Sequence, residues 1–167
     1  MNIAKVAQGI ITALLVVIVL ILLGVFFIPQ CMGYKPYNIQ TASMTPKYPI
    51  GSMIYVKKVA LEDLEVGDVV TYQTSSEGGW VVTHRLTRID KQTGVLVTKG
   101  DANNTEDGSI SYTSVIGKAT NFAIPFLGAL VTQYQNSSGK VITVSCIVVL
   151  LVLSFIIDLF AKKKNNE

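Results

Sequence analysis

The sequence contains few of the residues that hold metal ions or form disulfides. It has one histidine, His84, and two cysteines. Cys31 lies beside one long apolar run and Cys146 inside another, so the pair does not predict a disulfide framework. One histidine without a nearby set of cysteines is also a poor basis for a zinc site. We therefore expect no bound metal.

Phosphate-binding glycine loops and dinucleotide fingerprints are absent as well, so we expect no cofactor. The stretch "DANNTEDGS" (101–109) is rich in oxygen ligands, but its spacing misses the D-x-[DN]-x-[DN]-G calcium loop. The net charge is only +3, and much of it lies in the C-terminal tail. Nucleic-acid binding therefore has no support.

Charge is missing from two long stretches of the chain. No charged residue occurs from Val6 to Tyr34, and the run from Val141 to Phe160 carries only Asp158. Each run is about the 20 residues that a helix needs to cross a bilayer. A cleavable signal peptide is the alternative for the first run, but its apolar part is too long and "FIPQCMG" offers no A-x-A-like site. We expect two transmembrane helices.

The flanking charges predict the orientation of these helices. Lys5 precedes the first, and Lys162, Lys163 and Lys164 follow the second, which favours a cytoplasmic location for both termini. The expected organisation is a cytoplasmic start and first helix (1–29), an extracytoplasmic β-rich domain (30–140), a second helix (141–160) and a basic cytoplasmic tail (161–167). The expected location is the cell membrane.

Short runs rich in Val, Ile, Thr and Tyr fill the middle of the chain and are separated by glycines. This pattern is typical of strands joined by turns. The expected strands are 52–59, 68–74, 80–89, 94–100 and 114–124. The fold class is therefore mainly β, a small antiparallel domain between two membrane helices. The stretch "FAIPFLGAL" (122–130) predicts a short helix after Pro125. We expect it to pack into the core, and the alternative is an exposed apolar patch that rests on the bilayer.

The middle domain also holds the residues that acyl transfer requires. A serine hydroxyl is a weak nucleophile unless a base lies within hydrogen-bond reach, and the base needs an orienting partner. The sequence offers Ser43 in a turn, His84 in a strand, and Asp101 and Asp107 in the loop "KGDANNTEDGS". These residue types alone do not establish that the side chains converge, and a lone histidine is more often structural.

Four stretches, in order, resemble the motifs of type I signal peptidases. "TASMTPKYPIGSMIYVKKV" resembles their S-M-x-P box, "GDVVTY" a following strand, "VTHRLTRI" the segment of the general base, and "TKGDANNTED" their K-G-D loop. The resemblance covers roughly residues 38–121. A lysine fills the base position in the common bacterial branch. His84 fills it here, as in the endoplasmic-reticulum-type branch with archaeal and Gram-positive sporulation-associated members.

The resemblance implies a role for each matching residue. Ser43 is the expected nucleophile and His84 the expected general base. Asp107 would orient His84 and Asp101 would support the site, although the loop's spacing leaves an exchange of these two roles open. The oxyanion hole would use the backbone N–H of Ser43 and the hydroxyl of Thr41.

The implied protein is a membrane-anchored serine endopeptidase that removes signal peptides from exported preproteins. Its expected partners are signal peptides of secretory preproteins, membrane lipid and the secretion translocon. Two alternatives remain open. The β domain would bind exported proteins without catalysis, or Lys58 or Lys99 would act as the base of a Ser-Lys dyad.

Overall fold

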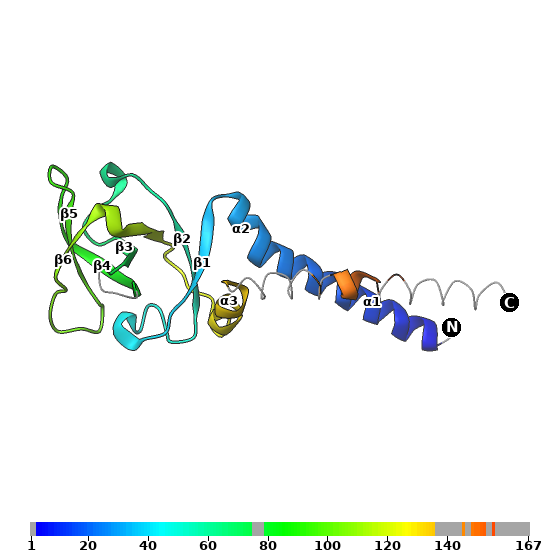
Figure 1. Ribbon diagram of the computed structural model, residues 1–167. Coiled ribbons are helices and arrows are strands. Elements are labelled where there is room, and N and C mark those ends of the chain that lie inside the picture. The colour runs from blue at the N-terminus through cyan, green and yellow to red at the C-terminus, as the bar shows by residue number, and fades with distance from the viewer. Residues whose placement is uncertain (1–2, 75–78, 136–144, 146–147, 153–154, 156–167) are drawn as a thin grey trace. The chain divides into compact units, whose positions relative to one another are not determined.

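The computed structural model describes residues 3–74, 79–135, 145, 148–152 and 155. The chain divides into two compact units. One unit is Pro29–Thr132, and the other combines Met1–Ile28 with Gln133–Glu167 (Figure 1). The first unit contains the predicted β domain and carries all the candidate site residues.

A long apolar helix forms near the N-terminus. It consists of α1 (Ile3–Leu22), the π-helical turn η1 (Leu23–Phe27) and α2 (Ile28–Cys31). The π turn precedes Pro29, which has no N–H to continue the α-helical pattern, and the N–H of Ile28 bonds to the carbonyl of Leu23 instead. Within the described residues, Gly9–Cys31 is the one helix long and apolar enough to cross a membrane.

The second predicted membrane helix, 141–160, lies mostly outside the described residues. Residues 145, 148–152 and 155 of it are described, and they are helical. Asp158 and the basic tail 161–167 also lie outside the described part of the chain.

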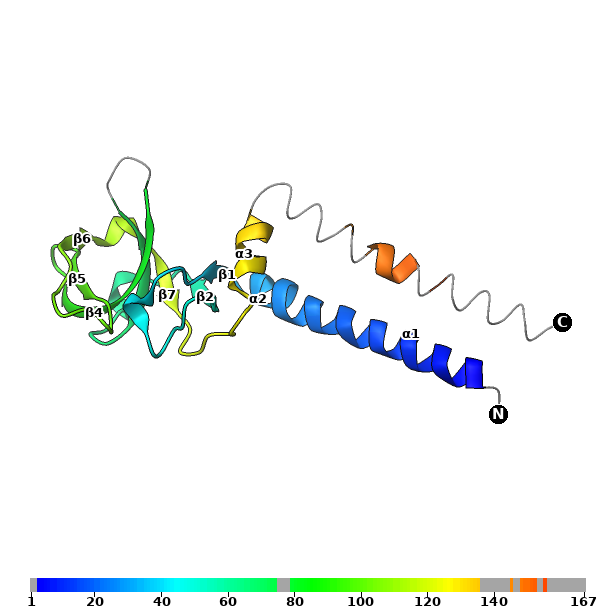
Figure 2. The ribbon, with the colours of Figure 1, turned by 90° about the horizontal axis from the view of Figure 1, so that it is seen from below.

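The β domain contains one seven-stranded antiparallel sheet in the order β1-β2-β7-β3-β4-β5-β6. The strands are β1 (Tyr34–Asn38), β2 (Met53–Lys57), β3 (Val69–Gln73), β4 (Val81–Asp90), β5 (Val95–Lys99), β6 (Ser109–Ser111) and β7 (Val115–Ala119). Figure 2 shows β1, β2 and β7 together on the side of the domain where the chain enters from α2. The predicted antiparallel β domain is confirmed.

Two clusters of buried side chains form the core. The first is formed by β2, β3, β7 and the segment between β1 and β2, and it contains Ile39, Met44, Tyr48, Ile54, Val56, Val69 and Ala119. The second, around β3, β4 and β5, contains Leu64, Val70, Tyr72, Leu86 and Leu96. Register shifts in the β3–β7 and β4–β5 pairings bend the sheet. The candidate site lies where β4 and the loop after β5 approach the short 3-10 turn η2 (Ala42–Met44).

The segment before the second apolar run differs from the sequence prediction. Helix α3 (Gly128–Gln135) does begin after Pro125. However, Phe122, Phe126 and Leu130 are 56%, 92% and 51% exposed, so the prediction that this stretch packs into the core was wrong for these side chains. The stretch is held by Ala123, which packs against the first core cluster, and through its backbone, because Ile124 pairs with Met53 in an isolated bridge.

Candidate active site

Ser43 lies on a short 3-10 turn, Ala42–Met44, that is anchored to the core by the residues after it. Met44 and Tyr48 are 1% and 0% exposed. The Tyr48 hydroxyl donates to the carbonyl of Thr120 at 2.7 Å. Burial raises the pKa of Tyr48 to about 12, so this donor keeps its proton. Burying a side chain of the size of Met44 contributes about 1.5–3 kcal/mol, which holds the Ser43 turn in place.

His84 lies in β4 and contacts Ser43. It is 8% exposed. Its Nε2 is 3.0 Å from Ser43 Oγ, and its Nδ1 is 2.6 Å from Asp107 Oδ2. A carboxylate only accepts, so Nδ1 must carry the proton and donate to Asp107. Nε2 is then free to accept the Ser43 hydroxyl proton, which is the arrangement that activates a serine nucleophile.

Asp101 contacts Arg85 rather than His84. Arg85 Nε and Nη2 donate to the two carboxylate oxygens of Asp101 at 2.8 and 2.6 Å, and the pKa of Arg85 is raised mainly by this bond. Arg85 Nη1 donates to the carbonyl of Gly67 at 2.7 Å. Successive residues of a strand point to opposite faces. The loop therefore supplies one carboxylate to His84 and another to its neighbour in β4.

The loop that carries both aspartates is bonded to the Ser43 turn. The N–H of Ala102 donates to the carbonyl of Ser43 at 2.8 Å. The ion pair with Arg85 holds Asp101, which directly precedes Ala102. The pair therefore influences Ser43 through the backbone of the loop. The sequence motifs did not identify Arg85. Its position next to His84 in an alternating strand was the available signal.

Thr41 lies beside the candidate nucleophile. Its Oγ1 is 3.1 Å from Ser43 Oγ, and either atom can donate. Ser43 itself is the second residue of a helical turn, where backbone N–H groups have no intrahelical acceptor. The Thr41 hydroxyl and the Ser43 N–H are the two donors that the sequence predicted for the oxyanion hole.

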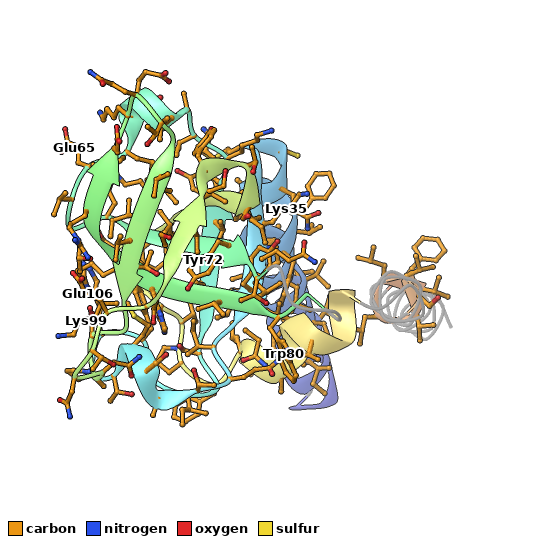
Figure 3. The ribbon with its side chains drawn as sticks, turned by 60° about the vertical axis from the view of Figure 1, so that its left-hand side comes forward. Lys35, Glu65, Tyr72, Trp80, Lys99 and Glu106 are labelled. Atoms are coloured by element: carbon orange, nitrogen blue, oxygen red, sulfur yellow. The ribbon has the colours of Figure 1, made fainter. Side chains whose placement is uncertain are left out.

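The lysines considered as alternative bases make no hydrogen bond to Ser43 among the described contacts. Lys58 is exposed, and Figure 3 shows Lys99 with Glu106 at the surface of the domain. Across the described part of the chain, no group of three or more His, Cys, Asp or Glu side chains is placed to hold a metal ion.

Comparison with known families identifies the chain. The model of the signal peptidase, peptidase S26 family matches residues 11–97, just over half of the sequence. The chain belongs to this family. The matched region includes Ser43 and His84 and ends before Asp101 and Asp107. The resemblance predicted from the four motifs is confirmed at the level of the family.

One curated relative is Signal peptidase I W of Bacillus subtilis (strain 168). The two are 35% identical over 101 residues, which is 58% of this chain and 52% of the relative. The chain thus aligns with about half the length of this signal peptidase. No solved structure matches the chain.

Replacing Gly100 by alanine is expected to disturb the site from the loop side. A Cβ there would lie 2.8 Å from the Ser43 carbonyl oxygen and 2.7 Å from Asn103 Nδ2. A displacement of about 1 Å in such a site costs about 100-fold, so we expect the peptide cleavage proposed below to fall by about 10- to 100-fold. Gly108→Ala is the matched control, because a Cβ at Gly108 would meet nothing within 4 Å. Equal cleavage rates for the two variants would contradict this role of Gly100.

Proposed function

We propose that this protein is a membrane-anchored serine endopeptidase that removes signal peptides from exported preproteins. The observation that carries the proposal is the chain of contacts from Ser43 Oγ to His84 Nε2 at 3.0 Å and from His84 Nδ1 to Asp107 at 2.6 Å. It occurs in a member of the signal peptidase family. The position of each atom suits nucleophile, general base and orienting carboxylate.

The proposed reaction has two halves. His84 Nε2 takes the Ser43 proton as Oγ attacks the carbonyl carbon before the scissile bond, and the C–N bond then breaks. His84 gives that proton to the leaving amine, which becomes the N-terminus of the mature protein. His84 next takes a proton from water as the oxygen attacks the ester. The bond between the acyl carbon and Ser43 Oγ then breaks, and Oγ takes the proton back from His84. The signal peptide leaves as a carboxylic acid and releases its own proton to water.

The negative oxygen formed in each half needs donors that are already in place. The N–H of Ser43 and the hydroxyl of Thr41 are the proposed pair. Thr41 Oγ1 is 3.1 Å from Ser43 Oγ, so its hydroxyl has only to rotate toward the oxygen. The Asp107 carboxylate accepts from His84 Nδ1 and stabilises the imidazolium that forms transiently on His84.

Among the described residues, the start of β4 has no strand partner on one edge beside the site, which supports a peptide substrate. β4 pairs with β5 only from Arg85 onward, whereas it pairs with β3 from Val81. The backbone bonds of Trp80 and Leu86 point toward the β3 side. Because these groups alternate along a strand, Val81 and Thr83 direct theirs to the opposite edge. An extended peptide added to this edge would run directly beside His84.

Residues 9–31 are the proposed membrane anchor. Only Met32 and Gly33 separate this helix from β1, a short tether for an enzyme whose substrate lies in the same membrane. We propose that both termini are cytoplasmic and that the second apolar run is a second span. Signal peptides, membrane lipid and the translocon are the proposed partners.

The test is cleavage of a secretory preprotein by the full chain in liposomes, with the new N-terminus of the product sequenced. We expect cleavage after a small residue that follows the apolar region of the signal peptide. Binding of the preprotein without cleavage would support the non-catalytic alternative and contradict the proposal. Cleavage at positions unrelated to the signal peptide would contradict the proposed substrate.

A further inference from the structure

One oxygen of Asp107 lies close to two hydroxyl groups besides His84. Thr98 Oγ1 donates to Asp107 Oδ2 at 2.7 Å. The Tyr72 hydroxyl lies 3.5 Å from the same oxygen and 3.2 Å from Thr98 Oγ1. His84 Nδ1 is 2.6 Å from this oxygen. Three side chains from three different strands therefore meet at one carboxylate atom.

Thr98 holds Asp107 at two points. Besides the hydroxyl contact, its carbonyl accepts the backbone N–H of Asp107 at 2.8 Å. Thr98 is 0% exposed and lies opposite Leu86 in the β4–β5 pairing. Leu86 is two residues from His84 on the same face of β4. Thr98 thus ties the carboxylate to the strand that carries the base.

Tyr72 is fixed by the core. It is 4% exposed and packs in the cluster with Leu64, Val70, Leu86 and Leu96. Figure 3 shows it inside the domain, whereas Lys99 and Glu106 lie at the surface. Burial is the main cause that raises the pKa of Tyr72, and the neighbouring Asp107 adds to it. The phenol therefore keeps its proton and remains a donor.

We propose that Thr98 and Tyr72 are positioning residues that hold the Asp107 carboxylate toward His84 Nδ1 and so keep the His84 Nε2 lone pair on Ser43. The Asp107 side chain is 23% exposed, so without these hydroxyls it has room to turn toward water. An imidazole whose Nδ1 partner moves away gains access to the other tautomer, in which Nε2 carries the proton. The expected loss of cleavage rate rests on the proposed function, whereas the expected change of the His84 tautomer does not.

Thr98→Val is the first test, because it replaces the hydroxyl by a methyl group of similar size. A hydrogen bond to a charged group accounts for about a 10- to 100-fold effect, so we expect kcat to fall by that factor with KM unchanged. Thr98→Ser restores the hydroxyl and is expected to return kcat to within about threefold. For Tyr72→Phe, whose hydroxyl is farther from Asp107, we expect a smaller loss of kcat.

Matched controls separate positioning from stability. Thr71 is also 0% exposed, and its hydroxyl pairs with that of Thr83 at 2.8 Å, away from Asp107. Tyr112 donates its hydroxyl to the carbonyl of Val59 at 2.7 Å. We expect Thr71→Val and Tyr112→Phe to lower the melting temperature while kcat stays unchanged. A fall of kcat in Thr71→Val equal to that in Thr98→Val, or no rescue by serine, would overturn the proposal.

The single histidine provides a readout that does not depend on cleavage. With ¹⁵N-labelled histidine, the NMR spectrum of the full chain in micelles reports one imidazole. We expect the Nδ1–H tautomer in the wild type, Thr98→Ser and Thr71→Val, and a population with Nε2–H in Thr98→Val. An unchanged tautomer in Thr98→Val overturns the positioning role. If Thr98→Val shifts the tautomer but the wild-type chain cleaves no preprotein, the proposed function is overturned and the positioning role stays supported.

Discussion

Ser43→Ala is expected to lower preprotein cleavage by about 10⁶-fold, the loss typical of a serine triad without its nucleophile. The reason is that His84 Nε2, 3.0 Å from Ser43 Oγ, would have no hydroxyl left to activate. The change removes only Ser43 Oγ and leaves the buried side chains of Met44 and Tyr48 in place, so the fold should persist. Cleavage rates in liposomes and the melting temperature measure the two effects.

Ser109→Ala serves as the control for this substitution. Ser109 is an exposed serine on β6, and its removal should change neither rate nor stability. If Ser43→Ala retained cleavage at a rate near that of Ser109→Ala, Ser43 would not be the nucleophile.

Asp107→Asn is expected to lower kcat by about 10⁴-fold, as when the orienting carboxylate of a serine triad becomes an amide. Asp107 Oδ2 accepts from His84 Nδ1 at 2.6 Å. An amide nitrogen in that position donates instead, which favours the imidazole tautomer with the proton on Nε2. That tautomer cannot take the proton of Ser43. Steady-state kinetics should show the loss in kcat with little change in KM.

Asp101→Asn separates the two loop aspartates. Asp101 bonds to both Arg85 Nε and Arg85 Nη2 and influences Ser43 only through the backbone of the loop. We expect a loss of kcat of about tenfold or less, together with a lower melting temperature, since a hydrogen bond to a charged group is weakened. A loss as large as that of Asp107→Asn would show that the two roles are not divided in this way.

The sequence predicted the strands that consist mostly of residues with high β propensity. β2, β3, β4, β5 and β7 were expected from their Val, Ile and Thr runs and bordering glycines. β1 was missed because it contains Pro36, which is tolerated there only because β1 is an edge strand. β6 was missed because it has only three residues and depends on pairing with β5.

Site residues that belong to a sequence motif could be predicted. Residues whose role depends on a tertiary contact could not. The motifs named Ser43 and His84 as candidates, and the family resemblance implied Asp107 as the partner of His84, which it contacts in the structure. Thr98 and Tyr72 looked like ordinary strand residues, because their contact with Asp107 arises only when β3, β5 and the loop meet. The close approach of Gly100 to Ser43 likewise has no local signal in the sequence.

The most direct test of the central claim, that Ser43 and His84 act as one unit, compares Ser43→Ala, His84→Ala and the double variant. Side chains that share one proton transfer are strongly non-additive. We predict that each single variant loses about 10⁶-fold in kcat and that the double variant is no slower than either. A double variant slower by the product of the two single losses would show that the residues act independently and would contradict the account.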